Sequence, residues 1–233
     1  MTEKSIFDFY HPDSPIGTEF LRIYHNVVKQ VGAKSTKSFL VTSAILGEGK
    51  STVASFLALT LGALSKKTLL VDADLRRPAL HRFFNLYLEE GISDVADGSI
   101  PLAKALKETK LASLKVLTAG RLSREPGDYF EEGHVRRILT EVETAYEFVI
   151  VDCAPVLPVV DALVMAQSMS GVLLVIKAGA THRELVKQAT EILQKAGSPL
   201  LGVLLNNAKQ VLPHYHEHRY AYEYYRPSAD ATP

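Results

Sequence analysis

Short apolar runs, each about the length of a β-strand, recur along the chain. They lie at residues 39–41, 69–71, 148–151, 172–176 and 203–205 and are apolar at successive rather than alternating positions. Strands with this pattern are buried on both faces, as in a parallel sheet covered by helices. Segments with helical spacing separate the runs, so the sequence predicts a doubly wound α/β domain with a mainly parallel sheet and helices on both faces.

Two of the intervening segments have the clearest helical periodicity. Residues 18–31 place apolar side chains on one side and end before Gly32, which predicts an amphipathic helix that packs on the outside of the domain or on a neighbouring molecule. A second helix is predicted from Thr181, where Thr181 and Glu184 form a capping-box pattern. Gly197 is its expected terminator.

The apolar periodicity stops near residue 206, which suggests three regions. We expect an N-terminal segment with the amphipathic helix at residues 1–37, a main domain at residues 38–206, and a flexible tail at residues 207–233. The tail contains five of the ten tyrosines of the chain but no pattern that would form a core.

Charge and cysteine content narrow the class of protein. The 26 basic and 26 acidic residues give a formal net charge of zero, which removes the broad positive field that non-specific nucleic-acid binding requires. The single cysteine, Cys153, cannot form an internal disulfide, and the sequence has neither a secretory signal pattern nor an apolar stretch of about 20 residues. We therefore expect a cytoplasmic protein that does not bind nucleic acid.

A phosphate-binding loop is predicted between the first strand and the next helical run. Residues 44–52 match the P-loop pattern, except that Ala44 stands where the strict pattern has Gly. Glycines let backbone N–H groups turn toward a phosphate, Lys50 can reach the β- and γ-oxygens, and Ser51 offers a hydroxyl to Mg²⁺. A turn that merely joins strand to helix would need neither Lys50 nor Ser51. The predicted nucleotide-binding residues here are Gly47, Glu48, Gly49, Lys50, Ser51 and Thr52.

Acidic residues follow two of the other predicted strands. Asp72 and Asp74 come after the run at 69–71, and Asp152 follows the run at 148–151. Ligands of open α/β sheets bind at the carboxyl ends of the strands, so these aspartates should meet the phosphates and their Mg²⁺. The alternative is that each aspartate caps a following helix.

These three segments together resemble the bacterial protein-tyrosine kinases that serve capsule and exopolysaccharide export. The P-loop resembles Walker A, residues 149–155 resemble Walker B, and residues 69–76 match the additional motif of three apolar residues followed by Asp-x-Asp-x-Arg. The resemblance implies a P-loop NTPase fold and a kinase that uses ATP and Mg²⁺ to phosphorylate its own tyrosines. It implies catalytic roles for Lys50, Asp72, Asp74 and Asp152, metal binding by Ser51 and the three aspartates, and an adenine contact at Asn206.

Two positions depart from the pattern of that family. Leu46 stands where the family commonly has Pro, which removes no phosphate contact. In the N-terminal helix, Glu19 and Arg22 match the family's pattern for ring-shaped oligomers, but His25 replaces its last Arg. An ordinary solvated pair on a helix is the alternative interpretation of Glu19 and Arg22.

The tyrosines of the tail are the phosphate acceptors that the resemblance implies. An aromatic segment that binds a partner is the alternative, and the nearby alternating histidines lack the Cys or acidic partners of a recognisable metal site. The predicted autophosphorylation sites are Tyr215, Tyr220, Tyr222, Tyr224 and Tyr225.

The resemblance also implies a partner and a place in the cell. Members of this kind work with a separate membrane-spanning polysaccharide co-polymerase, or adaptor, whose cytoplasmic segment activates the kinase at the inner face of the membrane. Two other functions remain open. A partition or division-site ATPase would carry Lys where this chain has Ile45. A non-catalytic scaffold gated by ATP would use the tail as a docking peptide.

Overall fold

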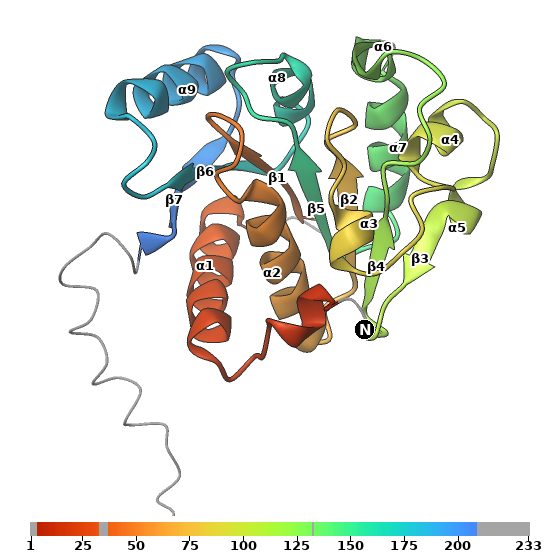
Figure 1. The fold of residues 1–233 in the computed structure, drawn as a ribbon, viewed down its shortest axis with the longest axis horizontal. Helices are drawn as coiled ribbons and strands as arrows, with labels where there is room; N and C mark the ends of the chain where they lie inside the picture. The colour runs from red at the N-terminus through yellow and green to blue at the C-terminus, as the bar shows by residue number, and fades with distance from the viewer. Residues whose placement is uncertain (1–3, 33–36, 132, 209–233) are drawn as a thin grey trace, which may run out of the picture.

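A seven-stranded sheet forms the centre of the computed structural model, which describes residues 4–32, 37–131 and 133–208 (Figure 1). The strand order is β3-β4-β2-β5-β1-β6-β7, and every neighbouring pair is parallel except β3 with β4. The strands are β1 (Lys37–Ser43), β2 (Thr68–Ala73), β3 (Leu106–Glu108), β4 (Leu114–Leu117), β5 (Phe148–Cys153), β6 (Gly171–Lys177) and β7 (Leu200–Asn206).

All five strands expected from the apolar runs are confirmed. The central strands β2 and β5 are buried along their whole length, which explains the apolar runs within them at 69–71 and 148–151. Strands β3 and β4 were not predicted, because Lys107 and Lys115 interrupt their short apolar patterns. Strand β3 is the edge strand and β4 lies next to it, and both lysines are only partly buried there.

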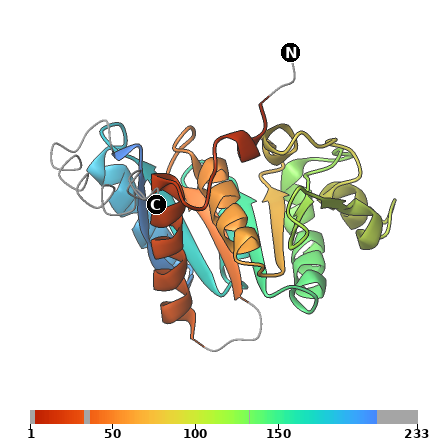
Figure 2. The ribbon, with the colours of Figure 1, turned by 90° about the horizontal axis from the view of Figure 1, so that it is seen from below.

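Helices cover both faces of the sheet, as the sequence predicts (Figure 2). One face packs against η1 (Ile6–Asp8), α1 (Pro15–Val31), α2 (Lys50–Ala63) and α3 (Leu80–Phe83). The other face packs against α4 (Ile92–Ala96), α5 (Leu102–Ala105), α6 (Pro126–Glu131), α7 (His134–Glu143), α8 (Asp161–Ala166) and α9 (Arg183–Lys195). Each face thereby has its own apolar core, and the doubly wound α/β fold is confirmed.

Helix α1 packs on the outside of the domain, against α2. It begins three residues earlier than the periodicity indicates, because the Ser14 side chain accepts a hydrogen bond from the Gly17 N–H at 3.1 Å. Its apolar side stacks Phe20 on Phe56, with ring centroids 5.4 Å apart. The helix ends at Gly32, whose φ of 73° suits glycine. Of the two expected locations, the domain surface is therefore confirmed.

The predicted N-cap of α9, Thr181, is wrong by one residue. The helix begins at Arg183 with His182 as its N-cap, and the Thr181 hydroxyl donates to Glu48 of the phosphate-loop segment instead of capping the helix. The predicted terminator is confirmed, since α9 ends at Lys195 and Gly197 follows with a φ of 72°.

The described residues contain no helix that is both long and apolar enough to span a membrane. The five tyrosines predicted as phosphate acceptors fall in the segment 209–233, outside the described residues.

Candidate functional site

The phosphate-loop segment joins β1 to α2 at the carboxyl edge of the sheet. Gly47 and Gly49 have φ angles of 80° and 91°, in the left-handed region that glycine adopts without strain. Gly49 is the N-cap of α2, and the helix starts at Lys50. Ala44 is fully buried with ordinary backbone angles, so its position requires no glycine. The loop therefore keeps its conformation despite the departure from the strict pattern.

The first turn of α2 contains Lys50, Ser51 and Thr52. Backbone N–H groups in a first helical turn have no acceptor within the helix, and the helix dipole adds positive potential there. The rest of α2 is anchored by buried apolar side chains between the sheet and α1. Such a fixed helix N-terminus is suited to binding an anion.

Lys50 lies between two of the predicted aspartates. Its Nζ is 2.6 Å from Asp74 Oδ2 and 3.5 Å from Asp152 Oδ1, and it donates to the Ser51 hydroxyl at 3.3 Å. Burial alone would lower the pKa of Lys50, but the charges of Asp152 and Asp74 raise it above its ordinary value. The side chain is therefore a cation held at the edge of the loop.

Asp72 and Asp152 come together because their strands are neighbours. Strands β2 and β5 pair in a register that sets Asp72 directly beside Asp152, and both side chains are fully buried. Burial raises the pKa of Asp72 to about 8, and the charge of Asp152 adds to the rise. Burial also raises the pKa of Asp152 to about 6, against the charge of Lys50. The structure thus brings Lys50, Asp72, Asp74 and Asp152 into one cluster.

The alternative interpretation, that each aspartate caps a following helix, applies to Asp72 but not to Asp152. Asp72 Oδ2 accepts hydrogen bonds from the N–H groups of Ala79 and Leu80, at 3.0 and 2.9 Å, where α3 begins. Asp74 Oδ1 accepts from the Arg77 N–H in a local turn at 3.0 Å. Within the described residues, neither carboxylate oxygen of Asp152 has a hydrogen-bond partner, and Asp72 Oδ1 has none either.

Asp152 Oδ1 has the charge of Lys50 at 3.5 Å, whereas Asp152 Oδ2 and Asp72 Oδ1 have no hydrogen-bond partner within the described residues. Buried acidic oxygens of this kind suit a hard cation, because a buried polar atom without a partner is costly. Over the described ranges, no three His, Cys, Asp or Glu side chains are arranged to hold a metal ion together. Mg²⁺ usually takes one or two protein oxygens and completes its shell with phosphate and water. The Ser51 hydroxyl and the aspartate oxygens match that donor set.

Asn206 contacts the phosphate loop from the end of β7. Its Nδ2 donates to the Glu48 carbonyl at 2.9 Å, and its Oδ1 accepts from the Asn207 N–H at 2.9 Å. A Cβ atom at Gly49 would lie 2.1 Å from Asn206 Nδ2, so only glycine fits there. Beside this contact lies a hollow of about 270 Å³ between α1, α2 and β7, with Thr52 and Phe20 in its wall.

Glu19 and Arg22 form an ion pair on α1, with 2.7 Å between Glu19 Oε1 and Arg22 Nη1. Both side chains are exposed, as an ordinary solvated pair would be, and Glu19 also borders the hollow beside Asn206.

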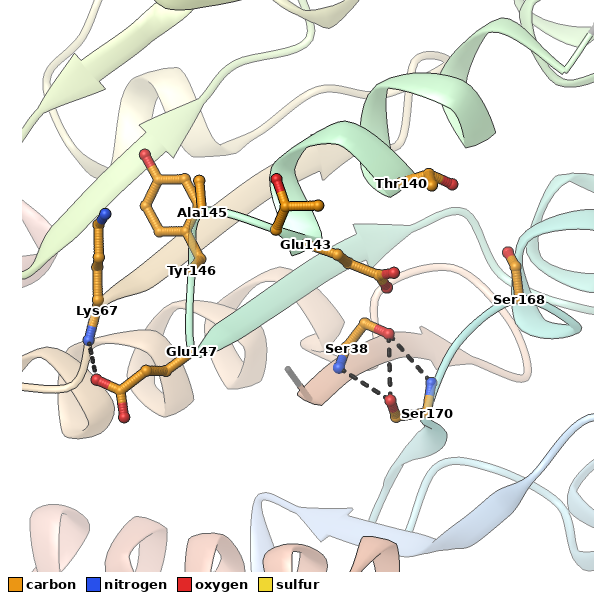
Figure 3. A pocket seen from close by; sticks show the side chains of 10 residues that line it. Ser38, Lys67, Thr140, Glu143, Ala145, Tyr146, Glu147, Ser168 and Ser170 are labelled. Atoms are coloured by element: carbon orange, nitrogen blue, oxygen red, sulfur yellow. Dashed lines mark hydrogen bonds between the residues drawn. The ribbon is translucent and has the colours of Figure 1, made fainter. Parts of the chain in front are cut away.

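A second hollow, of about 800 Å³, lies at the opposite edge of the sheet (Figure 3). Ser38 and Ser170 line it and hydrogen-bond each other, with the Ser170 N–H donating to Ser38 Oγ at 3.1 Å. Lys67 and Glu147 are joined through the Lys67 N–H at 3.2 Å. Ligands of open α/β sheets bind at the carboxyl ends of the strands, so the smaller hollow beside the phosphate loop is the functional candidate.

One pair at the carboxyl edge was not predicted. Arg76 of the Asp-x-Asp-x-Arg segment donates through Nε to Asp161 Oδ2 at 2.9 Å and through Nη2 to Asp161 Oδ1 at 3.3 Å. Asp161 is buried at the start of α8. No sequence signal marks Asp161, because it lies outside every motif and becomes Arg76's partner only in the folded chain.

Comparisons with known proteins give a consistent identification. A family model described as "ParA: NUBPL iron-transfer P-loop NTPase" matches residues 34–229. The chain is 32% identical to the tyrosine-protein kinase YwqD of Bacillus subtilis (strain 168), over 89% of this chain and 87% of that protein. It is 30% identical to the tyrosine-protein kinase CpsD of Streptococcus agalactiae serotype III (strain NEM316), over 82% of this chain and 84% of that protein.

Solved structures agree with these relatives. The kinase domain of the Escherichia coli tyrosine kinase ETK matches with a TM-score of 0.82 and 26% identity, over 88% of this chain and 81% of that chain. The cell-division ATPase MinD of Pyrococcus furiosus, at a TM-score of 0.63 and 23% identity over 78% of each chain, shares the fold. The P-loop NTPase family model implies that the chain binds a nucleotide. The chain belongs to the ParA-type P-loop NTPases and, within them, to the family of bacterial protein-tyrosine kinases.

Proposed function

We propose that this protein is a tyrosine kinase that moves the γ-phosphoryl group of ATP to tyrosines of its own tail and so regulates capsule or exopolysaccharide polymerisation and export. The observation that carries the proposal is the convergence of Lys50 with Asp72, Asp74 and Asp152 at the carboxyl edge of the sheet. A phosphate loop alone would serve any P-loop NTPase. The Asp-x-Asp-x-Arg segment adds two acids and Arg76, which the resemblance associates with tyrosine phosphorylation.

Positioning and charge neutralisation are the main tasks of such a site. We assign the N–H groups of residues 47–52 to the phosphates, Lys50 to their negative charge, and Ser51, Asp74 and Asp152 to Mg²⁺. Bound Mg²⁺ would offset the charge of the phosphate oxygens. Lys50 lies beside Asp74 and Asp152, so its positive charge is held at the edge of the phosphate loop.

Asp72 is our candidate for contact with the tyrosine hydroxyl, through its unpaired Oδ1. Proton transfer from a phenol of pKa about 10 to an ordinary carboxylate of pKa about 4 would cost roughly 8 kcal/mol. The raised pKa of Asp72, about 8, reduces that cost to about 3 kcal/mol once the carboxyl is ionised. Proton transfer late in a loose transition state remains consistent with this value.

The hollow beside Asn206 is our candidate for the adenine of ATP. The aromatic ring of Phe20 and the side chain of Thr52 border it, and the Asn206 amide supplies hydrogen-bonding groups. A concave, mostly apolar lining with a few polar groups is typical of sites that bind small ligands.

We also propose the division into residues 1–37, 38–206 and 207–233, with Tyr215, Tyr220, Tyr222, Tyr224 and Tyr225 as acceptors. The exposed pair Glu19 and Arg22 would contribute to contacts between copies in a ring. A membrane-spanning adaptor would recruit the protein from the cytoplasm to the inner face of the membrane and activate it there. Similarity to the kinase family supports these assignments.

The partition-type ATPase is the less favoured function. Its signature Lys is replaced by Ile45, and the similarity to MinD at 23% identity concerns the fold alone. A nucleotide-gated scaffold would show ATP-dependent binding to its adaptor without phosphotyrosine.

Phosphotyrosine formed by purified protein with ATP and Mg²⁺ tests the proposal. Lys50→Met and Asp72→Asn should each remove most of the label. Lys66→Met is a matched control, because Lys66 follows the far end of α2, where its partly exposed side chain lies 3.3 Å from Glu147 at the opposite edge of the sheet from the loop. Label that persists at full strength in Lys50→Met would refute the assignment of the site.

A further inference from the structure

The carboxylate of Glu48 is occupied by donors from the protein itself. Although Glu48 lies inside the phosphate loop, only 2% of its surface is exposed. Its Oε2 accepts the Ile45 N–H at 2.7 Å, and its Oε1 accepts the Thr181 hydroxyl and, at 3.4 Å, the Lys177 N–H. A buried carboxylate is tolerated when it has such partners. The side chain therefore joins the beginning of its own loop to a second loop.

That second loop runs from the end of β6 to α9. Strands β1 and β6 are parallel neighbours, so the segments that follow them leave the sheet side by side. Thr181 also accepts the Lys177 N–H at 3.2 Å, which fixes its hydroxyl between Lys177 and Glu48. Because His182 and not Thr181 is the N-cap of α9, the Thr181 hydroxyl has no role in the helix itself.

Residue 48 is held from the other side as well. Asn206 Nδ2 donates to the Glu48 carbonyl at 2.9 Å and lies against Gly49. Main chain and side chain of one loop residue are thus fixed from two places, the end of β7 and the segment at the end of β6. A loop that binds phosphate through backbone N–H groups depends on such fixed peptide orientations.

We propose that Glu48 is a positioning residue, which together with Thr181 holds the phosphate loop in its nucleotide-binding conformation. Its carboxylate acts through the loop backbone and has no contact with the phosphates. The inference rests on the proposed function only in so far as the loop binds ATP. It predicts that breaking the contact between Glu48 and Thr181 weakens nucleotide affinity while the fold stays intact.

Glu48→Gln and Thr181→Val remove the contact from either end. The Gln amide keeps one acceptor oxygen but turns an NH₂ group toward either the Ile45 N–H or the Thr181 hydroxyl. Thr181→Ser keeps the hydroxyl and should restore binding. Thr190→Val is the matched control, because the Thr190 hydroxyl donates only to the Lys187 carbonyl of its own helix.

The test is equilibrium binding of a fluorescent ATP analogue with Mg²⁺ to the full chain, with thermal unfolding measured on every variant. We expect Kd to rise about tenfold in Thr181→Val and in Glu48→Gln, the loss expected for one charge-assisted hydrogen bond. Thr181→Ser and Thr190→Val should stay within about twofold of the unchanged protein. In the double variant Glu48→Gln with Thr181→Val, Kd should equal that of Glu48→Gln alone, because both changes break one interaction.

Unchanged affinity in Thr181→Val would overturn the proposal, as would additive effects in the double variant. It would also be overturned if the loss of affinity followed the loss of melting temperature across all variants, Thr190→Val included. Failure of the unchanged protein to bind the analogue would contradict the proposed function itself and is therefore a distinguishable result.

Discussion

Replacing Asp72 by Asn removes a carboxyl group that the fold buries completely beside Asp152. Two backbone N–H groups, those of Ala79 and Leu80, donate to Oδ2, and the Asn amide oxygen can accept both. Oδ1 has no partner among the described residues, so the amide NH₂ group displaces no hydrogen bond there. The substitution therefore removes a titrating charge with little change of shape.

The expected effect on stability depends on pH. Burial raises the pKa of Asp72 to about 8, whereas an unfolded Asp has a pKa near 4. The folded state then holds the proton more tightly than the unfolded state, so this group stabilises the protein at low pH and loses its contribution as pH rises to about 8. One pKa unit corresponds to about 1.4 kcal/mol, and we expect the free energy of unfolding to fall by about 2 to 3 kcal/mol between pH 6 and pH 9.

Urea unfolding of nucleotide-free protein at pH 6, 7, 8 and 9 measures this dependence. In Asp72→Asn the fall of the unfolding free energy between pH 6 and pH 9 should largely disappear. The variant should be more stable than the unchanged protein at pH 9. Asp97→Asn is the control. Partial burial would raise the pKa of Asp97, but hydrogen bonds from Ser123 and Tyr129 hold it below its ordinary value, so this change should shift stability equally at all four pH values. If the free energy of unfolding changes with pH by the same amount in Asp72→Asn and in the unchanged protein, the reasoning is refuted.

Two further substitutions test the geometry of the site. Gly49→Ala should raise the nucleotide Kd at least tenfold and destabilise the fold by about 1–2 kcal/mol, because the new Cβ would meet Asn206 and the residue has a φ of 91°. Gly133→Ala is the control: Gly133 has a φ of 71° and no atom within 4 Å of the added Cβ, so this change should reproduce only the backbone strain. Equal Kd values for the two variants in titrations with a fluorescent nucleotide would count against the close contact. Asp161→Asn should lower the free energy of unfolding by about 1–3 kcal/mol and reduce phosphotyrosine formation, because Arg76 loses a charge-assisted hydrogen bond to Asp161. If urea unfolding is the same in this variant as in the unchanged protein, the pair does not contribute to stability.

The sequence predicts those parts of the fold in which residue type depends directly on burial. A strand buried on both faces is apolar over most of its length, so β1, β2, β5 and β6 are visible as runs. Strands β3 and β4 lie at an edge, and the lysines within them hide the pattern. The phosphate loop and the strand-end aspartates were predicted for a similar reason, since fixed residue types at fixed spacing carry their chemistry.

Contacts between distant segments could not be predicted in this way. Glu48 and Thr181 are 133 positions apart, and Arg76 and Asp161 are 85 apart. The capping-box pattern at Thr181 gave a wrong helix start because a buried carboxylate competes for the same hydroxyl. The adenine contact of Asn206 stays a prediction, beside the contact with Glu48 that the structure shows.

Transfer of phosphate to the tail is the central claim, and intact mass measured on a mixture of two variants tests it most directly. One variant ends at residue 208 and keeps the site but lacks the five tyrosines; the other, Lys50→Met, keeps the tail but lacks the phosphate-loop lysine. After incubation with ATP and Mg²⁺, we expect a ladder of phosphoryl additions on the tail of Lys50→Met in the mixture, and none on Lys50→Met alone. Equal ladders with and without the truncated variant would contradict the account, as would unmodified tails in the mixture and in the unchanged protein once the cytoplasmic segment of the adaptor has been added.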